Sequence, residues 1–295
     1  MKAALLPDRG VVKVTGDTAR TFLNGLLTAD IGKVSADAAR FAALLTPQGK
    51  VIVDCIVTEL PAEDGGGFFL DCPRALAQTL VERLNFYKLR AKIIVEDLSE
   101  TLGVLAVWDG TGSTEYGLVY RDPRLTELGF RVMLPPHLAA EAANDLGATL
   151  VDATEYETHR IALGIPRGGL DFMYGDAFPH ETDMDQLHGV DFDKGCYVGQ
   201  EIVSRMEHRG TARTRVVPVA HGEFVAGAGT QITAGDKTLG VMGSSTKGYG
   251  LASLRLDRVA DALSAGLPLM AGGIPLTLRK VQWARFSIPE AQKTS

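Results

Sequence analysis

One cysteine in this sequence stands among residues that can activate a thiol. Residues 194–201 read KGCYVGQE, so Cys196 has Gly195 directly before it and Lys194 two positions before it. Residues 200–206 carry apolar side chains on one side, which predicts a helix with Cys196 at or just before its first turn. Free N–H groups and the positive dipole end of a helix favour a thiolate, and the Lys194 ammonium adds a positive charge. The pattern predicts Cys196 and Lys194 as candidate catalytic residues.

The same stretch also has a structural interpretation. Most free cysteines are small buried residues without reactivity, and Cys196 would then fill a tight turn between a strand and a helix. The other two cysteines differ in their expected surroundings. Cys55 falls in an apolar strand and should react slowly, whereas Cys72 directly precedes a helix expected from Pro73 and is the internal competitor of Cys196.

A single acid interrupts an otherwise apolar strand. Residues 51–60 predict a strand in which Asp54 shares one face with Ile52 and Ile56. A buried carboxylate needs a partner or a function, so Asp54 is a second candidate catalytic or ligand-positioning residue. An acid at a strand edge that reaches solvent is the structural alternative.

Aromatic and basic residues follow the next expected helix. Leucines recur every four residues from position 76 to position 84, which predicts a helix with one apolar side. Tyr87, Lys88 and Arg90 come directly after it and could hold an anionic ligand. A helix end with solvated side chains is the commoner explanation for such residues.

An acidic segment adjoins a basic one near the cysteine. Residues 181–193 contain five acids and neither lysine nor arginine, whereas residues 194–215 contain five bases and two acids. The two segments could form a surface that neutralises itself. They could also form a pocket for a ligand with a hydrogen-bond-donating ring and an anionic tail.

Composition restricts the class of protein. A chain of 295 residues exceeds one usual core, so two or three domains are expected. The net charge of −6 argues against direct nucleic-acid binding and against attraction to an acidic membrane surface. Three cysteines without a CxxC pair do not form a four-cysteine metal site, and a disulfide framework is not expected. Without an apolar run of signal-peptide length in residues 1–10, we expect a soluble cytoplasmic protein.

Helices and strand pairs interchange irregularly, which is typical of an α+β fold. Helices are expected near residues 73–84, 136–146, 153–163, 200–206 and 255–264. Strands are expected near residues 3–6, 11–14, 41–45, 51–60, 68–70, 92–95, 102–108, 114–120 and 130–134. The short strands and glycine-rich turns after Gly210 predict a small barrel, with strands near 214–219, 231–233, 239–242, 250–254 and 276–281. We therefore expect a domain boundary near residue 210.

The motifs of several large enzyme classes are missing from the sequence. It contains no Walker A sequence, no HExxH and no GxSxG, and its six histidines show no metal-ligand spacing. No metal site is therefore predicted.

Residues 194–201, followed by Arg205 and residues 208–210, resemble the signature of the YgfZ family of folate-binding proteins. Further matching pieces extend over nearly the whole chain, at residues 87–90 (YKLR), 122–124 (DPR), 164–166 (GIP) and 250–252 (GLA). This family is similar to the T-protein of glycine cleavage, an aminomethyltransferase that uses tetrahydrofolate. The resemblance implies a folate-binding module of two interleaved ferredoxin-like parts over residues 1–210 and a small β-barrel over residues 211–295, arranged around a central hole.

The resemblance also implies a function. It indicates an accessory factor that binds tetrahydrofolate, or a derivative, in the assembly or maintenance of iron–sulfur clusters. The expected clients include the clusters of radical-SAM enzymes that modify tRNA. Folate and iron–sulfur client or assembly proteins are the implied partners, and Cys196 is the implied key residue.

Individual positions carry this implication. Glu181 falls where T-proteins place a glutamate that contacts the pterin, and a carboxylate can accept paired hydrogen bonds from a pterin ring. Tyr87, Arg90 and Arg205 complete the expected folate-binding set together with Asp54.

The T-protein comparison also leaves an alternative function. The T-protein carries two adjacent acids in the strand that matches residues 49–57, and here Val53 replaces one of them and Asp54 remains. The T-protein lacks the cysteine of KGCYVGQE, which favours the accessory factor. The alternative is a tetrahydrofolate-dependent aminomethyl or one-carbon transferase in which Asp54 positions the folate.

Overall fold

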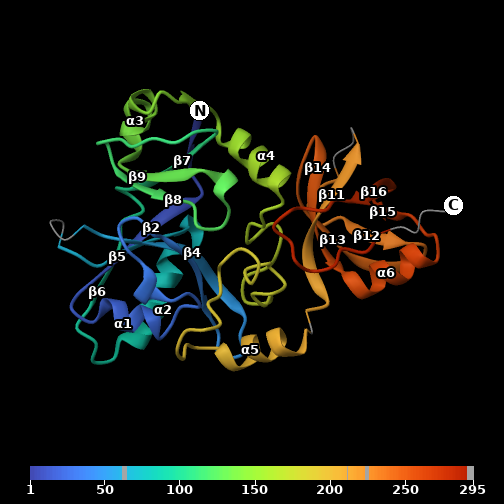
Figure 1. Cartoon of the computed structure of the whole chain (residues 1–295), viewed down its shortest axis with the longest axis horizontal. Coiled ribbons are helices and arrows are strands. Elements are labelled where there is room, and N and C mark those ends of the chain that lie inside the picture. Colours follow the sequence, from blue (N-terminus) through green and yellow to red (C-terminus); the bar gives the residue numbers. More distant parts are fainter. Residues whose placement is uncertain (62–64, 211, 223–225, 291–295) are drawn as a thin grey trace. The chain divides into compact units, whose positions relative to one another are not determined.

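The computed structural model describes residues 1–61, 65–210, 212–222 and 226–290 (Figure 1). Contacts divide the chain into two units. Unit 1 contains Met1–Tyr156 and Leu187–Gln200, and unit 2 contains Glu157–Gln186 and Glu201–Ser295. The boundary expected near residue 210 therefore lies inside unit 2, which includes residues 157–186 and 201–210 in addition to the barrel.

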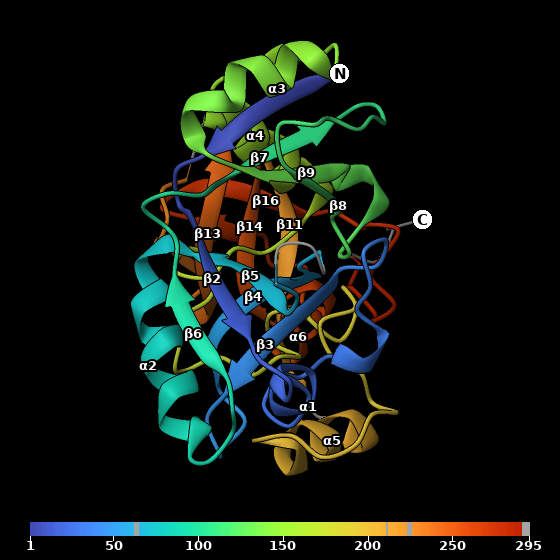
Figure 2. The same ribbon diagram turned by 90° about the vertical axis from the view of Figure 1, so that its left-hand side faces the viewer.

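Unit 1 is built on two five-stranded sheets (Figure 2). The first sheet has the strand order β10 (Thr149–Leu150), β1 (Lys2–Leu6), β7 (Gly103–Trp108), β9 (Phe130–Leu134) and β8 (Leu118–Arg121). The second has the order β3 (Arg40–Leu45), β4 (Val51–Glu59), β5 (Phe68–Pro73), β2 (Arg9–Thr15) and β6 (Ile94–Asp97). The helices of this part are α1 (Ala19–Asn24), α2 (Ala77–Lys88) and α3 (Ala139–Asp145), with 3₁₀ turns at Ile31–Lys33, Arg74–Leu76, Thr126–Leu128 and Pro136–Leu138.

Each sheet of unit 1 packs against a helix with small or branched apolar residues. Leu80 and Leu84 of α2 are fully buried in a core with residues of β2, β4 and β5. Ala139, Ala142 and Ala143 of α3 pack in a second core with residues of β1, β7 and β9. These are the two apolar helix faces that the sequence periodicity predicts over residues 73–84 and 136–146.

The first two strands separate into different sheets although only Pro7 and Asp8 lie between them. β1 pairs with β7 and β10, whereas β2 pairs with β5 and β6. The sequence predicts two strands joined by a turn, and both strands are present. Their partners come from residues about 60 to 150 positions away, so local sequence does not determine the pairing.

Unit 2 contains a closed six-stranded barrel, which confirms the expected α+β class with a C-terminal β-barrel. Its strand order is β11 (Thr214–Gly222), β14 (Gly248–Arg255), β13 (Lys237–Thr246), β12 (Gln231–Ala234), β15 (Leu269–Ala271) and β16 (Ile274–Leu278). Helix α6 (Leu256–Ser264) buries Val259 and Ala262 in the barrel core. Strand β15 was not predicted, because a three-residue strand carries too little periodicity to detect.

Two further helices match their predicted positions. Helix α4 spans Ala153–Leu163, the range expected from the sequence. Helix α5 spans Gln200–Arg209 and so begins at the expected residue but continues three residues further.

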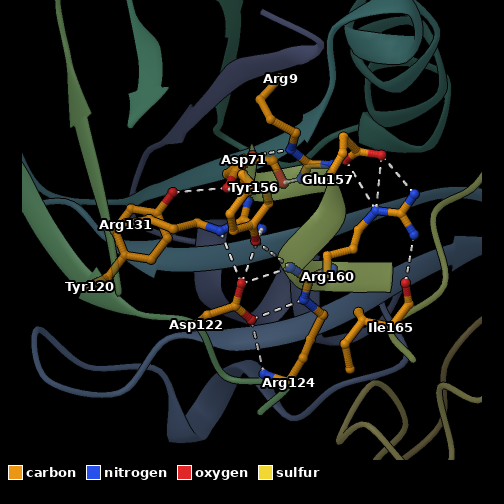
Figure 3. A network of polar contacts seen from close by, with 10 residues as sticks. All are labelled: Arg9, Asp71, Tyr120, Asp122, Arg124, Arg131, Tyr156, Glu157, Arg160 and Ile165. Atoms are coloured by element: carbon orange, nitrogen blue, oxygen red, sulfur yellow. Dashed lines mark hydrogen bonds and ion pairs between the residues drawn. The ribbon is translucent and has the colours of Figure 1, made fainter. Parts of the chain in front are cut away.

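A buried ionic network joins the two sheets of unit 1 (Figure 3). The fully buried Asp71 carboxylate accepts hydrogen bonds from Arg9 Nε at 2.6 Å, Arg131 Nη1 at 2.5 Å and the Tyr120 hydroxyl at 2.9 Å. Asp71 and Arg9 lie on the second sheet, whereas Arg131 and Tyr120 lie on the first. One carboxylate thus receives donors from both sheets.

A second buried carboxylate extends the network. Asp122 accepts from Arg124 Nε at 2.9 Å and Nη2 at 2.7 Å, and from Arg131 Nε at 3.0 Å. The Tyr156 hydroxyl accepts from Arg131 Nη2 at 3.3 Å. Arg131 therefore contacts both buried aspartates, and its side chain is only 3% exposed.

The arginines keep both carboxyl groups ionised. Burial, the largest influence, acts to raise the pKa of each carboxyl, but the neighbouring arginines outweigh it. Arg9 and Arg131 hold the pKa of Asp71 below its ordinary value, and Arg124 and Arg131 do the same for Asp122. Stability from such groups is present above the unfolded-state pKa of about 3.9 and is lost as the pH falls toward the lower folded-state values.

Replacing Arg131 tests this network. Arg131→Met leaves two buried carboxylates short of a cation and should lower the free energy of unfolding by about 3–5 kcal/mol. It should also weaken the loss of stability below pH ~4, because the depressed carboxyl pKa values return toward normal. Urea unfolding at pH 7 and at lower pH measures both effects.

The matched control is Arg121→Met, on the exposed residue that follows Tyr120. We expect it to change stability by less than about 0.5 kcal/mol. Equal effects of the two substitutions would show that the network does not stabilise unit 1.

Candidate functional site

The KGCYVGQE loop is fastened to unit 1 through Lys194. Its ammonium donates to the backbone carbonyls of Asn24 at 2.7 Å, Leu27 at 2.6 Å and Ala29 at 2.8 Å. It also lies 5.1 Å from the centre of the Tyr197 ring. A lysine has three N–H donors, and these three carbonyls use them all.

This arrangement gives Lys194 a structural role in the loop. Burial lowers the pKa of Lys194 to about 8, against the opposing charges of Asp30 and Asp191. Because its donors all go to carbonyls, none is left to hydrogen-bond the Cys196 thiolate. Lys194 is a positioning residue that holds the loop.

Cys196 is exposed, in contrast to the two other cysteines. Helix α5 begins at Gln200, so three residues separate Cys196 from it and the thiol is not in the first helical turn. Strand β5 includes Cys72 and Pro73, and a 3₁₀ turn at Arg74–Leu76, with Pro73 as its N-cap, leads directly into α2 at Ala77.

The two other cysteines, Cys55 and Cys72, have inaccessible thiols. Cys55 is 1% and Cys72 0% exposed. Burial raises the pKa of Cys72 to about 12 and raises that of Cys55 well above its ordinary value. Cys72 is therefore not the competitor that its sequence position predicts, and Cys196 is the accessible thiol.

The two glycines of the loop have different roles. Gly199 has φ +83°, and a Cβ there would lie 2.6 Å from the Thr46 carbonyl oxygen and 3.1 Å from Gly49 Cα. Gly199 thus lets the loop pack against the turn between β3 and β4. A Cβ on Gly195 would meet no atom within 4 Å, so this glycine leaves open space beside Cys196.

Asp54 lies inside the second sheet of unit 1. It is 8% exposed on β4, between β3 and β5, where it pairs with Ala43. An edge position open to solvent, the structural alternative, does not apply. Burial lowers the pKa of the Arg9 guanidinium, but Asp71 and, more weakly, Asp54 outweigh burial and raise it. Asp54 is thus electrostatically coupled to the buried network.

Tyr87 and Arg90 lie at the C-terminal end of α2. Tyr87 is half-buried against the core and makes an edge contact with the Phe86 ring at 5.4 Å. Arg90 is exposed, beside Leu89, which is 91% exposed. The structure thus holds Tyr87 by packing and leaves Arg90 on the surface.

Glu181 lines a pocket of unit 2. The pocket measures about 590 Å³ and combines apolar and acidic residues, which include Leu170, Met173, Asp176, Glu181, Val241 and Met242. One oxygen of Glu181 accepts from the Phe178 N–H at 2.9 Å. A carboxylate beside apolar walls can bind a flat ring that carries N–H donors.

Arg205, the remaining candidate, lies on the surface of α5. Its guanidinium pairs with Glu201 one turn earlier, at 2.7 Å, and both side chains are more than half exposed. Arg205 and Glu181 belong to unit 2, whereas Cys196, Lys194, Asp54, Tyr87 and Arg90 belong to unit 1.

A buried arginine shapes the pocket wall and was missed from the sequence. Arg160, on α4, is 2% exposed and donates to the Ile165 carbonyl at 2.7 Å (Figure 3). It also donates to Asp171 Oδ2 at 3.0 Å and to Ser244 Oγ at 2.7 Å. Asp171 in turn accepts from the Ser244 N–H at 2.6 Å. These bonds fix the loop with Asp171 to β13. The only sequence signal is an arginine that directly precedes the apolar residues Ile161 and Ala162 near the end of a helix.

The two loop glycines provide a matched test of the anchored loop. Gly199→Ala should destabilise the protein by at least about 1–2 kcal/mol, because it combines a positive φ with contact to backbone atoms. Gly195→Ala should change stability by less than about 0.5 kcal/mol. Thermal unfolding measures the melting temperature of both variants. Equal melting temperatures would contradict the tight packing at Gly199.

Comparisons with known proteins agree with this architecture. Residues 213–286 match the family model of the C-terminal β-barrel domain of CAF17. The solved structure of the glycine cleavage system aminomethyltransferase T from Bartonella henselae covers 98% of this chain and is itself 88% covered, with a TM-score of 0.75. At 17% identity, that likeness shows the fold alone.

The curated relatives have a consistent name. The mitochondrial iron–sulfur cluster assembly factor IBA57 homolog of Mycosarcoma maydis is 34% identical over 231 residues, which are 74% of this chain and 57% of the relative. The chain spans a little over half the length of such fungal relatives.

These names contradict the expected cytoplasmic location. The fungal, human and mouse relatives are all named as mitochondrial proteins. The absence of a signal-like run in the first ten residues was therefore the wrong basis for assigning a compartment. Separately, none of the helices in the described ranges is both long and apolar enough to cross a membrane.

The human and mouse relatives match this chain over most of its length and most of theirs, which shows the family. The human mitochondrial iron–sulfur cluster assembly factor IBA57 is 30% identical over 284 residues, which are 88% of this chain and 78% of the human protein. The mouse protein is 32% identical with the same coverage. This chain belongs to the IBA57 family of iron–sulfur cluster assembly factors.

Proposed function

We propose that this protein acts in the assembly of iron–sulfur clusters and that the Cys196 thiolate is its contact with the cluster. The observation that carries the proposal is an exposed thiol on a loop held by Lys194 and Gly199. Thiolates are the usual protein ligands of iron–sulfur clusters. The names of the relatives support the same role.

The number of accessible thiols suggests how the cluster is held. A cluster usually has four cysteine ligands. Cys55 and Cys72 are in the core, which leaves Cys196 as the accessible cysteine of the chain. The other ligands must then come from a partner, so the cluster is a shared cargo of this chain and an assembly or client protein.

The YgfZ-type assignment adds two finer parts to the proposal. The first is that the pocket beside Glu181 binds the pterin of tetrahydrofolate, supported by its carboxylate and its apolar walls. The second is that the clients include radical-SAM enzymes that modify tRNA. This second part depends on the KGCYVGQE resemblance, and tRNA modification levels in a deletion strain test it.

A folate-dependent aminomethyltransferase is the second candidate function. The shared fold with the T-protein and the buried Asp54 favour it. A transferase turns over an aminomethyl donor in the presence of tetrahydrofolate, whereas the accessory factor does not. Measurable transfer by the purified wild-type protein would decide for the transferase.

Cys196→Ser tests the main proposal. The substitution removes the thiolate from an exposed position, so the melting temperature should stay within about 2 °C of the wild type. In a strain that lacks this gene, the variant should fail to restore the activity of iron–sulfur enzymes. Cys72→Ala is the control, because it also removes a thiol but should restore activity. Full complementation by Cys196→Ser would refute the role of the thiol.

Glu181→Ala tests folate binding. Loss of paired hydrogen bonds to a carboxylate should weaken tetrahydrofolate binding by on the order of 2–4 kcal/mol, which calorimetry measures. Asp236→Ala, at an exposed position between β12 and β13, should leave the affinity unchanged. If wild-type protein gives neither heat nor displacement with tetrahydrofolate, the folate part of the proposal fails.

A further inference from the structure

Three side chains of unit 2 that serve neither the thiol nor the pterin pocket come together in space. One ring nitrogen of His180 and one carboxylate oxygen each from Asp185 and Glu207 lie within 4.8 Å of one another. His180 Nε2 is 3.0 Å from Glu207 Oε2. The sequence predicts no metal site, because residues 180, 185 and 207 form no local motif and only the fold brings them together.

The turn that carries His180 is held by its own hydrogen bonds. The Pro179 carbonyl accepts from the Met184 N–H at 2.9 Å and from the Thr182 hydroxyl at 3.0 Å. The Asp183 N–H donates to the His180 carbonyl at 3.2 Å, with Asp183 at φ +60°. A left-handed conformation at a non-glycine residue persists only where the surroundings enforce it.

Arg215 orients the second ligand. Its Nη1 and Nη2 reach the two oxygens of Asp185 at 2.6 and 2.9 Å, and Nη1 also donates to the His180 carbonyl at 2.6 Å. The guanidinium lies 4.7 Å from the centre of the Phe286 ring. An ionised carboxylate has about four acceptor positions. Arg215 occupies two and Gln186 a third, so Asp185 keeps one for a cation.

Arg215 also contacts a second, fully buried carboxyl group. Asp183 Oδ1 is 3.4 Å from Arg215 Nη1, the same nitrogen that contacts Asp185. Burial raises the pKa of Asp183 well above its ordinary value, and Arg215 offsets only part of that shift. The three groups that meet within 4.8 Å are therefore His180, Asp185 and Glu207.

The charges and the donor types indicate which ligand fits. Asp185 and Glu207 bring two carboxylates to the group and Arg215 brings one guanidinium, so one negative charge remains for a cation. One imidazole with carboxylates suits first-row transition metals, whereas Mg²⁺ and Ca²⁺ prefer oxygen ligands only. The Glu207 side chain is 45% exposed, which gives an ion access from solvent.

We propose that His180, Asp185 and Glu207 bind a divalent first-row transition-metal ion. The ion replaces the proton between His180 and Glu207 and supplies the positive charge that Arg215 alone does not. The site contains no cysteine, so it needs no thiolate.

Manganese binding to the full-length protein tests the site. Cys196→Ser serves as the background, so that the exposed thiol cannot bind the metal. The free Mn²⁺ signal in electron paramagnetic resonance should fall with one saturable site per chain. Glu207→Gln should weaken binding by about tenfold or more, whereas Glu201→Gln on the same helix should not change it. Zn²⁺ should displace Mn²⁺, and equal concentrations of Mg²⁺ should not.

Three results would overturn the site. They are no saturable binding in the Cys196→Ser background, equal losses from Glu207→Gln and Glu201→Gln, and displacement by Mg²⁺ as efficient as by Zn²⁺. His180→Gln is a second variant that should also weaken binding. Because it alters a buried residue, circular dichroism must show that it folds. Glu207→Gln changes a part-exposed side chain and decides the question if His180→Gln does not fold.

Discussion

Arg131 holds two buried carboxylates at once, and the arrangement of unit 1 depends on that contact. Asp71 belongs to the second sheet and Asp122 follows a strand of the first, so one guanidinium connects the two sheets. Buried ions are expensive to desolvate, and they are tolerated only when every charge is matched. These ion pairs therefore restrict the position of one sheet of unit 1 relative to the other. It also sets the surroundings of Asp54, whose charge acts on Arg9 in the same network.

The KGCYVGQE loop is also held by a buried cation. Lys194 gives its three donors to carbonyls of residues 24–29, and Gly199 lets the loop touch the turn after β3. Both contacts involve backbone atoms, which hold their positions better than long side chains. The loop is thereby ordered while Cys196 stays exposed. When an exposed thiol on an ordered loop binds a ligand, no further entropy is lost in ordering the loop.

Unit 2 repeats the pattern with two other arginines. Arg160 fastens the loop around Asp171 to the barrel, and Arg215 fastens the turn around His180. In each case, a buried guanidinium replaces the regular secondary structure that these loops lack. The loops can then present Glu181 to a pocket and the His180 group to solvent through Glu207. The ordered loops of both units thus depend on buried cations.

Local patterns in the sequence determined the elements, and the tertiary structure decided their partners. The strands at 130–134 and 214–219, helix α4 and the barrel class follow from periodicity and turn residues, which act over a few positions. The unusual composition of KGCYVGQE is likewise a local property of the sequence. By contrast, the burial of Cys72, the carbonyl contacts of Lys194 and the separation of β1 from β2 depend on residues tens of positions away. The meeting of His180 with Glu207 likewise requires the folded chain, because non-local contacts leave no periodic signal in a single sequence.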